Sequence, residues 1–310
     1  MSFACSKGRD SLMITVFGSI NMDLIATTER LPKPGETVAG NGFATAAGGK
    51  GANQALAARR AGRYVHMAGA VGKDAFAADA LALLDEAGTD LSLVKHVDGP
   101  TGTALILVGG DGENMIAVVP GANGLVTPAD AEIAIGRMNE GDMLMLQLEV
   151  PVAAVERALS AARAKGITSI LNLAPLIPDA PRLGRLADIV IANETEFERL
   201  AGQNGMDTQE REAALVRLHQ ETGQTLIVTL GGDGVIAIRD GVISRAQGLA
   251  IDPVDTVGAG DTFCGYFAAS LDDVDFPTAL RRAAVAGSLA CLKSGAQPSI
   301  PLSEEVADRI

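Results

Sequence analysis

The sequence predicts an α/β fold: a three-layer sandwich with a central, mainly parallel sheet between layers of helices, and a small β-sheet lid. Short apolar runs typical of buried strands alternate with helical segments along most of the chain. The 310 residues are 47% hydrophobic and 20% charged and include 36 glycines, a composition typical of α/β proteins with a large core. Two segments depart from the alternation, and we interpret these as the lid.

The first predicted strand is the apolar run at residues 13–18. Ser19, Asn21 and Asp23 follow it at alternate positions, so on an extended backbone their side chains share one face. Amide and carboxylate groups offer the donors and acceptors that sugar hydroxyls need. A polar turn explains the same residues about equally well.

The two departures from the alternation are both β-rich. Leu-Pro-Lys-Pro-Gly-Glu at residues 31–36 interrupts the chain before residues 37–46 resume with mixed polarity. Residues 101–119 contain two apolar runs around a glycine-rich turn at residues 109–112, which predicts a β-hairpin. We expect both segments to form one sheet that covers a ligand site.

A glycine-rich stretch, G-G-K-G-A-N-Q at residues 48–54, opens a predicted helix that reaches about residue 61. Its adjacent glycines let the backbone approach a ligand, and Lys50 and Asn53 add polar groups. The sequence contains no G-x-x-x-x-G-K-[ST] motif, and no G-x-G-x-x-G follows a predicted strand. A helix start with glycines used only for packing is the alternative.

The middle of the chain repeats a strand–helix pattern. Predicted strands occupy residues 65–70, 143–148, 168–173, 189–192 and 226–230, and predicted helices include 75–87, one that starts at Thr127, and 151–165. Such alternation favours a parallel sheet between helices. Glu149 follows one of these strands, at the edge where open α/β sheets bind ligands.

Two more strand ends carry candidate ligand groups. Asn193-Glu194-Thr195-Glu196 suits water-mediated organisation of Mg²⁺, although acids in a first helical turn also occur for electrostatic reasons alone. The stretch T-L-G-G-D-G at residues 229–234 suits nucleotide phosphates, and a tight β-turn is the alternative.

The central chemical motif is D-T-V-G-A-G-D-T-F-C-G at residues 255–265. We expect a β-rich segment to end near Val254 and a helix to occupy residues 262–271. Free N–H groups at Gly258-Ala259-Gly260, with the helix dipole, would stabilise developing negative charge. Asp261 beside them suits removal of a proton from an alcohol. A simple helix cap explains the aspartate about as well.

The C-terminal part continues with a predicted helix at residues 283–292 and an irregular loop at residues 293–299. Carbonyl groups of such a loop, together with an aspartate, suit a large monovalent cation.

Charge and cysteine content exclude several classes of function. The net charge of −13 argues against a nucleic-acid or anionic-membrane partner. Cys5, Cys264 and Cys291 are too few and too scattered for a disulfide framework or a zinc site. Residues 1–12 lack the apolar core of a signal peptide, and no run approaches about 18 apolar residues. We therefore expect a cytoplasmic protein.

Taken together, the motifs resemble those of the ribokinase family of carbohydrate kinases, the PfkB superfamily. The similarity covers about residues 14–301. It is carried by G-S-I-N-M-D (18–23), P-G-E-T-V (34–38), G-G-K-G-A-N-Q-A (48–55), G-A-N (121–123), Q-L-E (147–149), N-E-T-E (193–196), T-L-G-x-x-G (229–234), D-T-V-G-A-G-D-T-F (255–263) and G-A-Q-P-S (295–299).

The resemblance implies a role for each matching residue. The implied sugar-binding residues are Asn21, Asp23, Gly48, Gly49, Lys50, Asn53 and Glu149. Asp261 matches the catalytic base, and Gly258, Ala259 and Gly260 match the anion hole. The implied nucleotide contacts are Asn193, Thr229, Gly231, Gly232, Gly234 and Gly260. Glu196 matches the acid that organises Mg²⁺ through water, and the implied K⁺ site comprises Asp255, Val257, Ala290, Lys293, Gly295 and Ser299.

The resemblance also implies an activity and an assembly. We expect a single ribokinase-like domain at residues 13–303, with a lid from about 24–46 and 101–120, that uses ATP to phosphorylate D-ribose at O5. The family further implies a homodimer formed through the lids. Ala284 stands where some relatives have a histidine near adenine. A related kinase for deoxyribose, another sugar or a nucleoside, and a sugar-binding regulator without catalysis, are the alternatives.

Overall fold

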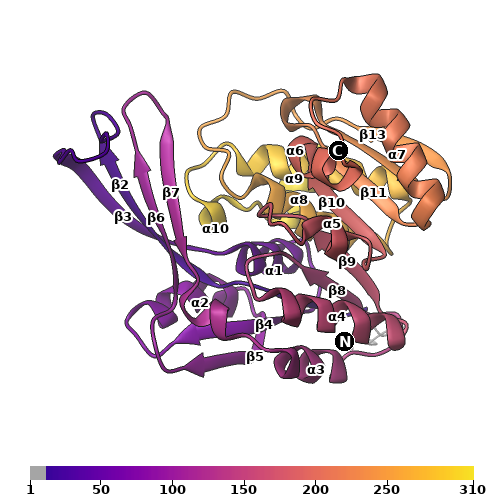
Figure 1. Cartoon of the computed structure of the whole chain (residues 1–310), viewed down its shortest axis with the longest axis horizontal. Coiled ribbons are helices and arrows are strands. Elements are labelled where there is room, and N and C mark those ends of the chain that lie inside the picture. Colours follow the sequence, from indigo (N-terminus) through magenta and orange to yellow (C-terminus); the bar gives the residue numbers. More distant parts are fainter. Residues whose placement is uncertain (1–11) are drawn as a thin grey trace, which may run out of the picture.

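The computed structural model describes residues 12–310, which form a nine-stranded and a four-stranded sheet (Figure 1). The large sheet has the order β13-β12-β11-β10-β9-β8-β1-β4-β5. All its neighbours pair in parallel except at one edge, where β12 and β13 are antiparallel. These strands are β1 (Ile14–Phe17), β4 (Val65–Gly72), β5 (Asp90–Val97), β8 (Met143–Leu146), β9 (Thr168–Asn172), β10 (Ile189–Asn193), β11 (Thr225–Thr229), β12 (Val235–Arg239) and β13 (Val242–Ala246).

Helices cover both faces of this sheet and form two apolar cores, as the alternation of strands and helices predicts. One core contains α1 (Lys50–Arg60), α2 (Phe76–Glu86), α8 (Ala259–Ser270) and α9 (Phe276–Ala290). The other contains α3 (Pro128–Gly136), α4 (Val152–Ala164), α5 (Ala180–Gly184), α6 (Glu194–Ala201) and α7 (Thr208–Thr222). Strand side chains alternate between the cores: Met143 and Met145 join the first, Leu144 and Leu146 the second. The predicted three-layer sandwich is confirmed.

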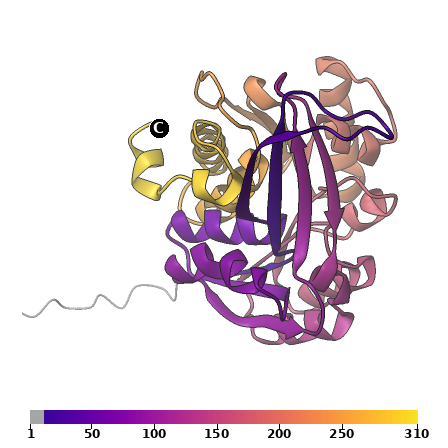
Figure 2. The same cartoon turned by 90° about the vertical axis from the view of Figure 1, so that its left-hand side faces the viewer.

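The lid is the small sheet, with the order β3-β2-β6-β7, and it stands beside the α/β body (Figures 1 and 2). It consists of β2 (Asn21–Thr28), β3 (Gly40–Gly48), β6 (Gly102–Val108) and β7 (Asn114–Val119). The hairpin predicted for residues 101–119 is confirmed as β6 and β7, which pair antiparallel. Because β2 and β3 begin and end at Asn21 and Gly48, the lid strands lead directly into the body.

Several element boundaries differ from the sequence prediction. The β-rich segment expected to end near Val254 is wrong, because the last strand, β13, ends at Ala246 and residues 247–258 are irregular. In this segment the N–H of Leu249 donates to the Ser288 hydroxyl at 3.0 Å, a side-chain contact in place of a strand ladder. Helix α8 begins at Ala259, three residues before the expected position. Helix α9 begins at Phe276, capped by Asp275, instead of at residue 283.

The remaining elements are short. They are two 3₁₀ helices, η1 (Gly121–Leu125) and η2 (Gly231–Asp233), and the C-terminal helices α10 (Ala296–Ser299) and α11 (Ser303–Ala307). Among residues 12–310, none of the helices combines the length and apolar character that crossing a bilayer requires. Cys5 and the predicted absence of a signal peptide lie outside the described residues.

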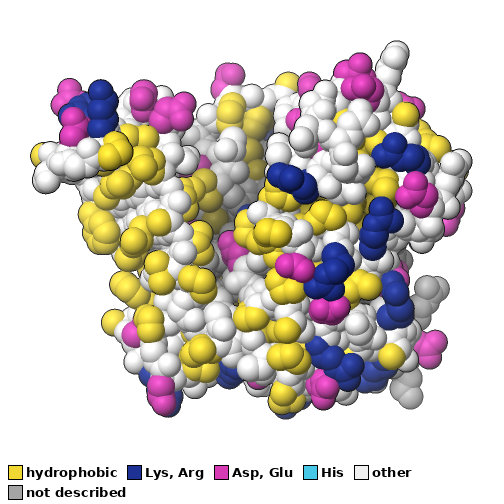
Figure 3. All heavy atoms as spheres, in the orientation of Figure 1, with side chains coloured by type: hydrophobic (Ala, Val, Ile, Leu, Met, Phe, Trp, Pro, Cys, Tyr) yellow, Lys and Arg dark blue, Asp and Glu magenta, His cyan; other side chains and the backbone are white. Residues whose placement is uncertain are grey.

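Five parallel strands end at the same edge of the sheet, and each is followed by polar residues. The carboxyl ends of β1, β8, β9, β10 and β11 and the segments after them bring together Ser19 to Asp23, Gln147 to Glu149, Asn172, Asn193 to Glu196 and Thr229 to Gly234. The lid rises beside this edge, and Figure 3 shows the surface hollowed between the lid and the body. The topology therefore places the candidate site at the bottom of that hollow.

Candidate active site

Asp261 lies where helices α1 and α8 meet, and two amide side chains hold its carboxylate. Asn53 Nδ2 donates to one oxygen at 2.9 Å, and Gln54 Nε2 donates to the other at 3.0 Å. The approach depends on Gly265, whose Cβ, if present, would lie 2.6 Å from the Gln54 carbonyl oxygen. The carboxylate is thus fixed by α1 although it belongs to α8.

The predicted anion hole is the first turn of α8. Gly258 is the N-cap in the left-handed region, with φ of 77°, and the N–H of Ala259 donates to the Thr256 carbonyl at 3.3 Å. The next N–H groups, of Gly260 and Asp261, precede any acceptor within the helix and remain available to an anion. A Cβ at Gly260 would meet nothing within 4 Å in the described chain, so the space beside these N–H groups is open to a ligand.

Glu149, just after β8, is fixed by two donors, one from the segment after β1 and one from α1. The Ser19 hydroxyl donates to its Oε2 at 2.5 Å, and the Lys50 N–H donates to the same oxygen at 3.0 Å. The N–H of Gly51 in turn donates to the Ser19 hydroxyl at 3.2 Å. One carboxylate oxygen is therefore committed to the protein, and Oε1 is the atom that can accept from a ligand hydroxyl.

Asn21 and Asp23 lie on β2 beside the glycines that open α1. Asn123 Oδ1 accepts from the N–H of Ile20 at 2.9 Å, so its amide nitrogen donates to Asn21 Oδ1 at 2.7 Å. This arrangement leaves the Asn21 amino group as its free end, a donor for a ligand oxygen. A Cβ at Gly48 would lie 2.4 Å from an Asp23 oxygen, and Gly49 has φ of 89°, so both positions require glycine.

The site concentrates negative charge around one lysine. Burial, reinforced by Glu149 and Asp261, raises the pKa of Asp23 from 3.8 to about 6. The pKa of Lys50 is raised, mainly by Asp261. Burial also raises the pKa of Glu196. Lys50 lines a small cavity with Asp261 and Glu196, so its charge serves that cavity as well as the sugar side to which the sequence assigned it.

Two adjoining cavities lie on the other side of Asp261. The larger, of about 350 Å³, includes the predicted residues Thr229, Gly231, Gly232, Gly234 and Gly260 in its lining, together with Ala284. The smaller, of about 130 Å³, is lined by Lys50, Asn193, Glu196, Thr229, Gly260 and Asp261, among others. Because Thr229 and Gly260 line both cavities, a single elongated ligand can occupy the two.

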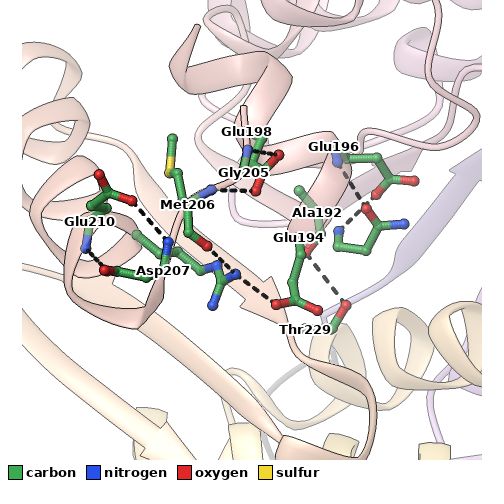
Figure 4. A network of polar contacts seen from close by, with 11 residues as sticks. Ala192, Glu194, Glu196, Glu198, Gly205, Met206, Asp207, Glu210 and Thr229 are labelled. Carbon is green, nitrogen blue, oxygen red and sulfur yellow. Dashed lines mark hydrogen bonds and ion pairs between the residues drawn. The ribbon is translucent and has the colours of Figure 1, made fainter. Parts of the chain in front are cut away.

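The N-terminus of α6 has a capping box that fixes Asn193 and Glu196 at the smaller cavity (Figure 4). The Asn193 N–H donates to Glu196 Oε2 at 2.8 Å, and the Glu196 N–H donates to Asn193 Oδ1 at 2.8 Å. Arg211 on α7 supports this helix start through an ion pair with Glu194 at 2.7 Å, drawn in the same figure. One Glu196 oxygen is used by the cap, and the other suits a water-mediated contact to Mg²⁺. In the described part of the chain, no three His, Cys, Asp or Glu side chains are grouped to hold a metal ion directly.

The segments predicted to bind K⁺ come together at the end of α9. The N–H groups of Val254 and Asp255 donate to the Cys291 carbonyl at 2.8 and 3.2 Å. The Asp255 carboxylate accepts from Val257 N–H at 3.0 Å and from Gly295 N–H at 2.9 Å. A carboxylate, main-chain carbonyls and the Ser299 hydroxyl are the oxygen ligands that hard cations prefer, so these residues fit the ion. Lys293 differs from the rest, since its ammonium group points to Glu305 at 3.4 Å and only its carbonyl can contribute.

Sequence reasoning missed several residues that the fold brings to this site. Gln54, Gln147 and Asn172 form a hydrogen-bonded group behind Asp261, and Asn123 fixes Asn21. Ser19, which the sequence placed on one face with Asn21 and Asp23, holds Glu149. Gln54, Gln147 and Asn123 lie within the family motifs, so their presence there was the available signal. Asn172 lies outside those motifs and is found only through its position as the last residue of β9.

An acidic pocket, a fixed carboxylate, free helix-terminal amides and an elongated cavity define a class: a kinase that transfers a phosphoryl group to a small hydroxylated acceptor. The chain belongs to the pfkB family of carbohydrate kinases, whose family model matches residues 11–302.

Two curated relatives and one solved structure illustrate how similar the chain is to individual members of the family. The ribokinase of Haemophilus influenzae is 35% identical over 297 residues, which cover 95% of this chain and 97% of that protein. The deoxyribokinase of Salmonella typhi is 33% identical over 296 residues, with coverage of 94% and 96%. Among solved structures, Arabidopsis thaliana ribokinase complexed with ribose and ATP is 31% identical. It superposes with a TM-score of 0.84 over 96% of this chain and 98% of that one.

Proposed function

We propose that this protein is an ATP-dependent kinase that phosphorylates D-ribose at O5 to give D-ribose 5-phosphate. One observation carries the proposal: Asp261 lines the cavity that adjoins the larger one, and its charge also acts on Asp23, which lies among the candidate sugar-binding residues. These residues include Asn21, Asp23 and Glu149. The ribokinases among its relatives supply the identity of the sugar.

In the proposed reaction, Asn21, Asp23 and Glu149 hold the sugar so that its O5 hydroxyl faces Asp261. The carboxylate accepts the hydroxyl proton as O5 attacks the γ-phosphorus of ATP and the bond to the β-γ bridging oxygen breaks. The N–H groups of Gly260 and Asp261, with the Lys50 ammonium, stabilise charge on the transferring group. Because transition states of phosphoryl transfer are commonly loose, positioning contributes more than the basicity of the aspartate.

Two metal ions belong to this proposal. Mg²⁺, when bound, would neutralise phosphate charge, with Glu196 reaching it through water and Asn193 beside it. K⁺ would occupy the loops held by Asp255, with carbonyl groups of Val257, Ala290, Lys293 and Gly295 and with Ser299 as further ligands. Since Asp255 lies three residues before Gly258, this ion would act by ordering the start of α8.

A second candidate substrate is deoxyribose, which the 33% identical deoxyribokinase of Salmonella typhi favours. The 2-hydroxyl is the only difference between the sugars. A site that hydrogen-bonds this hydroxyl with buried groups discriminates strongly against its absence.

Release of ADP by the purified full-length chain tests the proposed function. It is measured by coupled assay with ribose, deoxyribose, other pentoses, hexoses and nucleosides, in K⁺ and then in Na⁺. The proposal predicts the highest kcat/KM for ribose and a loss of rate in Na⁺. Equal rates with and without every sugar would leave a non-catalytic sugar-binding protein as the better explanation.

We also propose a homodimer formed through the lids in a cytoplasmic enzyme. The lid residues Phe43, Leu105 and Met115 are 72%, 47% and 52% exposed. An apolar face of this kind on a small sheet is typical of a surface that a partner covers.

A further inference from the structure

Behind Asp261 lies a connected group of buried amide side chains that the proposed mechanism does not use. Gln54 and Gln147 are both fully buried and come from α1 and from the segment after β8. Gln147 Nε2 donates to Gln54 Oε1 at 2.6 Å, and Gln54 Nε2 donates to Asp261 at 3.0 Å and to Asn172 Oδ1 at 3.2 Å. Asn172 Nδ2 then donates to the Ile191 carbonyl at 3.2 Å.

The direction of this chain of hydrogen bonds is fixed. An ionised carboxylate only accepts, so the amino end of Gln54 faces Asp261 and its oxygen faces Gln147. Gln147 must then present its own amino end to Gln54. A reversed Gln54 would place an oxygen against the carboxylate and against Asn172 Oδ1, so these two acceptors fix the amide, and Gln147 Nε2 pairs with its oxygen.

Within residues 12–310, the oxygen of the Gln147 side chain, Oε1, is buried without a hydrogen-bond partner, which is energetically unfavourable. Gly18 makes room for this atom, because a Cβ at Gly18 would lie 1.9 Å from it. An unsatisfied buried oxygen is unfavourable, but an aliphatic side chain here would avoid that penalty only by leaving the buried Gln54 Oε1 without its hydrogen bond. The part of Gln147 that the fold uses is therefore its amino end, which pairs with Gln54.

We propose that Gln54 and Gln147 are positioning residues for the catalytic base: Gln147 pairs with the Gln54 oxygen and so keeps Gln54 in place, and Gln54 holds the Asp261 carboxylate directed at the acceptor hydroxyl. This inference rests on the proposed function, because it assigns the two glutamines to the same phosphoryl transfer. Asp23, Lys50 and Glu196 are the charged groups that influence Asp261, and the Cys264 thiol lies beside them. None of these groups contacts Gln54 Oε1, so within residues 12–310 the pairing of that buried oxygen depends on Gln147.

The test compares Gln54→Met and Gln147→Met with a matched control, Gln224→Met. Gln224 is also buried, but its amide donates to the carbonyls of Gly184 and Ala187, far from Asp261 in the fold. Two readouts are measured for each folded variant. One is the pH profile of kcat together with KM for ribose, and the other is a ¹³C titration of the Asp261 carboxyl group in the ligand-free protein, assigned with Asp261→Asn.

We expect Gln54→Met to lower kcat by about 10- to 100-fold, because a hydrogen bond to a charged group is lost. KM for ribose should stay within about 3-fold, since ground-state sugar contacts remain. The carboxyl titration and the acid limb of kcat should both move to higher pH. Gln147→Met, which does not touch Asp261, should change both in the same direction by a smaller amount.

Gln224→Met should lower the melting temperature without moving either titration. Unchanged titrations in both site variants, or equal shifts in the control, would overturn the inference. The ¹³C titration needs no turnover, so it still decides the question if the wild-type protein phosphorylates no sugar, an outcome that would reject the proposed function instead.

Discussion

At the scale of single residues, the site works by holding one carboxylate in a fixed direction. Asp261 accepts from Asn53 and Gln54, and these contacts leave its remaining lone pairs toward the two ligand pockets. The aspartate needs no unusual basicity, because a loose transition state transfers the proton late. Its value therefore lies in placement and charge, and both are lost when the group becomes an amide.

The first prediction concerns Asp261→Asn. An asparagine keeps the size of the side chain but cannot accept the O5 proton, so kcat should fall by at least about 100-fold. The dissociation constant for ribose should change little, because Asn21, Asp23 and Glu149 are untouched. Steady-state kinetics and calorimetry measure the two quantities, and a variant with most of its activity would remove Asp261 from the role of base.

The second prediction concerns Asp23, whose folded-state pKa of about 6 lies above its ordinary value of 3.8. The folded protein therefore holds this proton more tightly than the unfolded chain. Its contribution to stability is complete below about pH 4 and is lost as the pH rises through 6. Ionised Asp23 then costs on the order of 3 kcal/mol at pH 8, since each pKa unit is about 1.4 kcal/mol.

Asp23→Asn should therefore raise the melting temperature at pH 8 and give no gain at pH 4. It should also weaken ribose binding, because an acceptor is replaced by a group that is half donor. Thermal unfolding at both pH values measures the effect. An equal gain at pH 4 and pH 8 would show that its cause is not the ionisation.

Single residues also show how much of the candidate site can be predicted from the sequence alone. It assigns Asp261, Asn53 and Glu149 to one site, because each stands in a motif whose residue types suit the chemistry. Gln54 belongs to the same motif as Asn53, but its residue type and position indicate no particular role. Its partners Gln147 and Asp261 are 93 and 207 positions away, and only the fold brings them into contact.

At the scale of elements, the site depends on the close packing of α1 against α8. Gly265 allows it, since a Cβ there would lie 2.5 Å from Ala57 Cβ and 2.6 Å from the Gln54 carbonyl oxygen. Backbone atoms cannot move away as a flexible side chain can. Any larger residue at position 265 must push the two helices apart.

The third prediction is that Gly265→Ala destabilises the protein by about 1–3 kcal/mol, the usual effect of overpacking. It should also lower kcat, because Asn53 and Gln54 move away from Asp261. Urea unfolding measures the stability. Gly136→Ala on α3 is the matched control: a Cβ there meets nothing within 4 Å in residues 12–310, so it should be neutral or slightly stabilising. Equal effects of the two variants would contradict this explanation.

Elements are predictable where local patterns are strong. The buried strands of the parallel sheet and the hairpin of the lid follow from apolar runs and turn residues. The prediction of a strand near Val254 is wrong, because its apolar residues serve loops that line the larger cavity and hold Asp255. An apolar run does not reveal whether its partner is a strand, a cavity or solvent.

At the scale of the whole molecule, the two sheets have different roles. The large sheet fixes the polar side chains at one edge, and the lid stands over the hollow beside that edge (Figure 3). The sequence predicts both sheets and their relation to the site, since the motif residues Asn21 and Gly48 stand where β2 begins and where β3 ends. The polar residues Asn21 and Asp23 indicate which face of β2 meets the ligand, but the sequence does not show which apolar residues of the other three strands share that face.

The register of the lid strands shows which of their side chains share a face of the lid. Phe43, Ala26, Leu107 and Met115 form one row across the sheet, and Leu24 and Leu105 share the next row on the same face. Asp23 alternates with Leu24 and therefore lies on the opposite face, the one we propose meets the sugar. The face that carries Phe43 and Leu105 points away from the site and is free to meet a second lid.

The last prediction follows from this geometry. A charge in the centre of an apolar interface is costly to desolvate, so Phe43→Glu should convert a dimer into monomers, as measured by sedimentation at several concentrations. Ile133→Glu is the matched control, because Ile133 is 57% exposed but lies on α3, away from the lid. That variant should remain dimeric. A wild-type protein that sediments as a monomer throughout, or a Phe43→Glu protein that stays dimeric, would exclude this face as the interface.

If the dimer also stabilises each lid, Phe43→Glu should raise KM for ribose, since closure over the sugar then loses the support of the second subunit. Asp261 and its amide partners should keep their contacts in this variant.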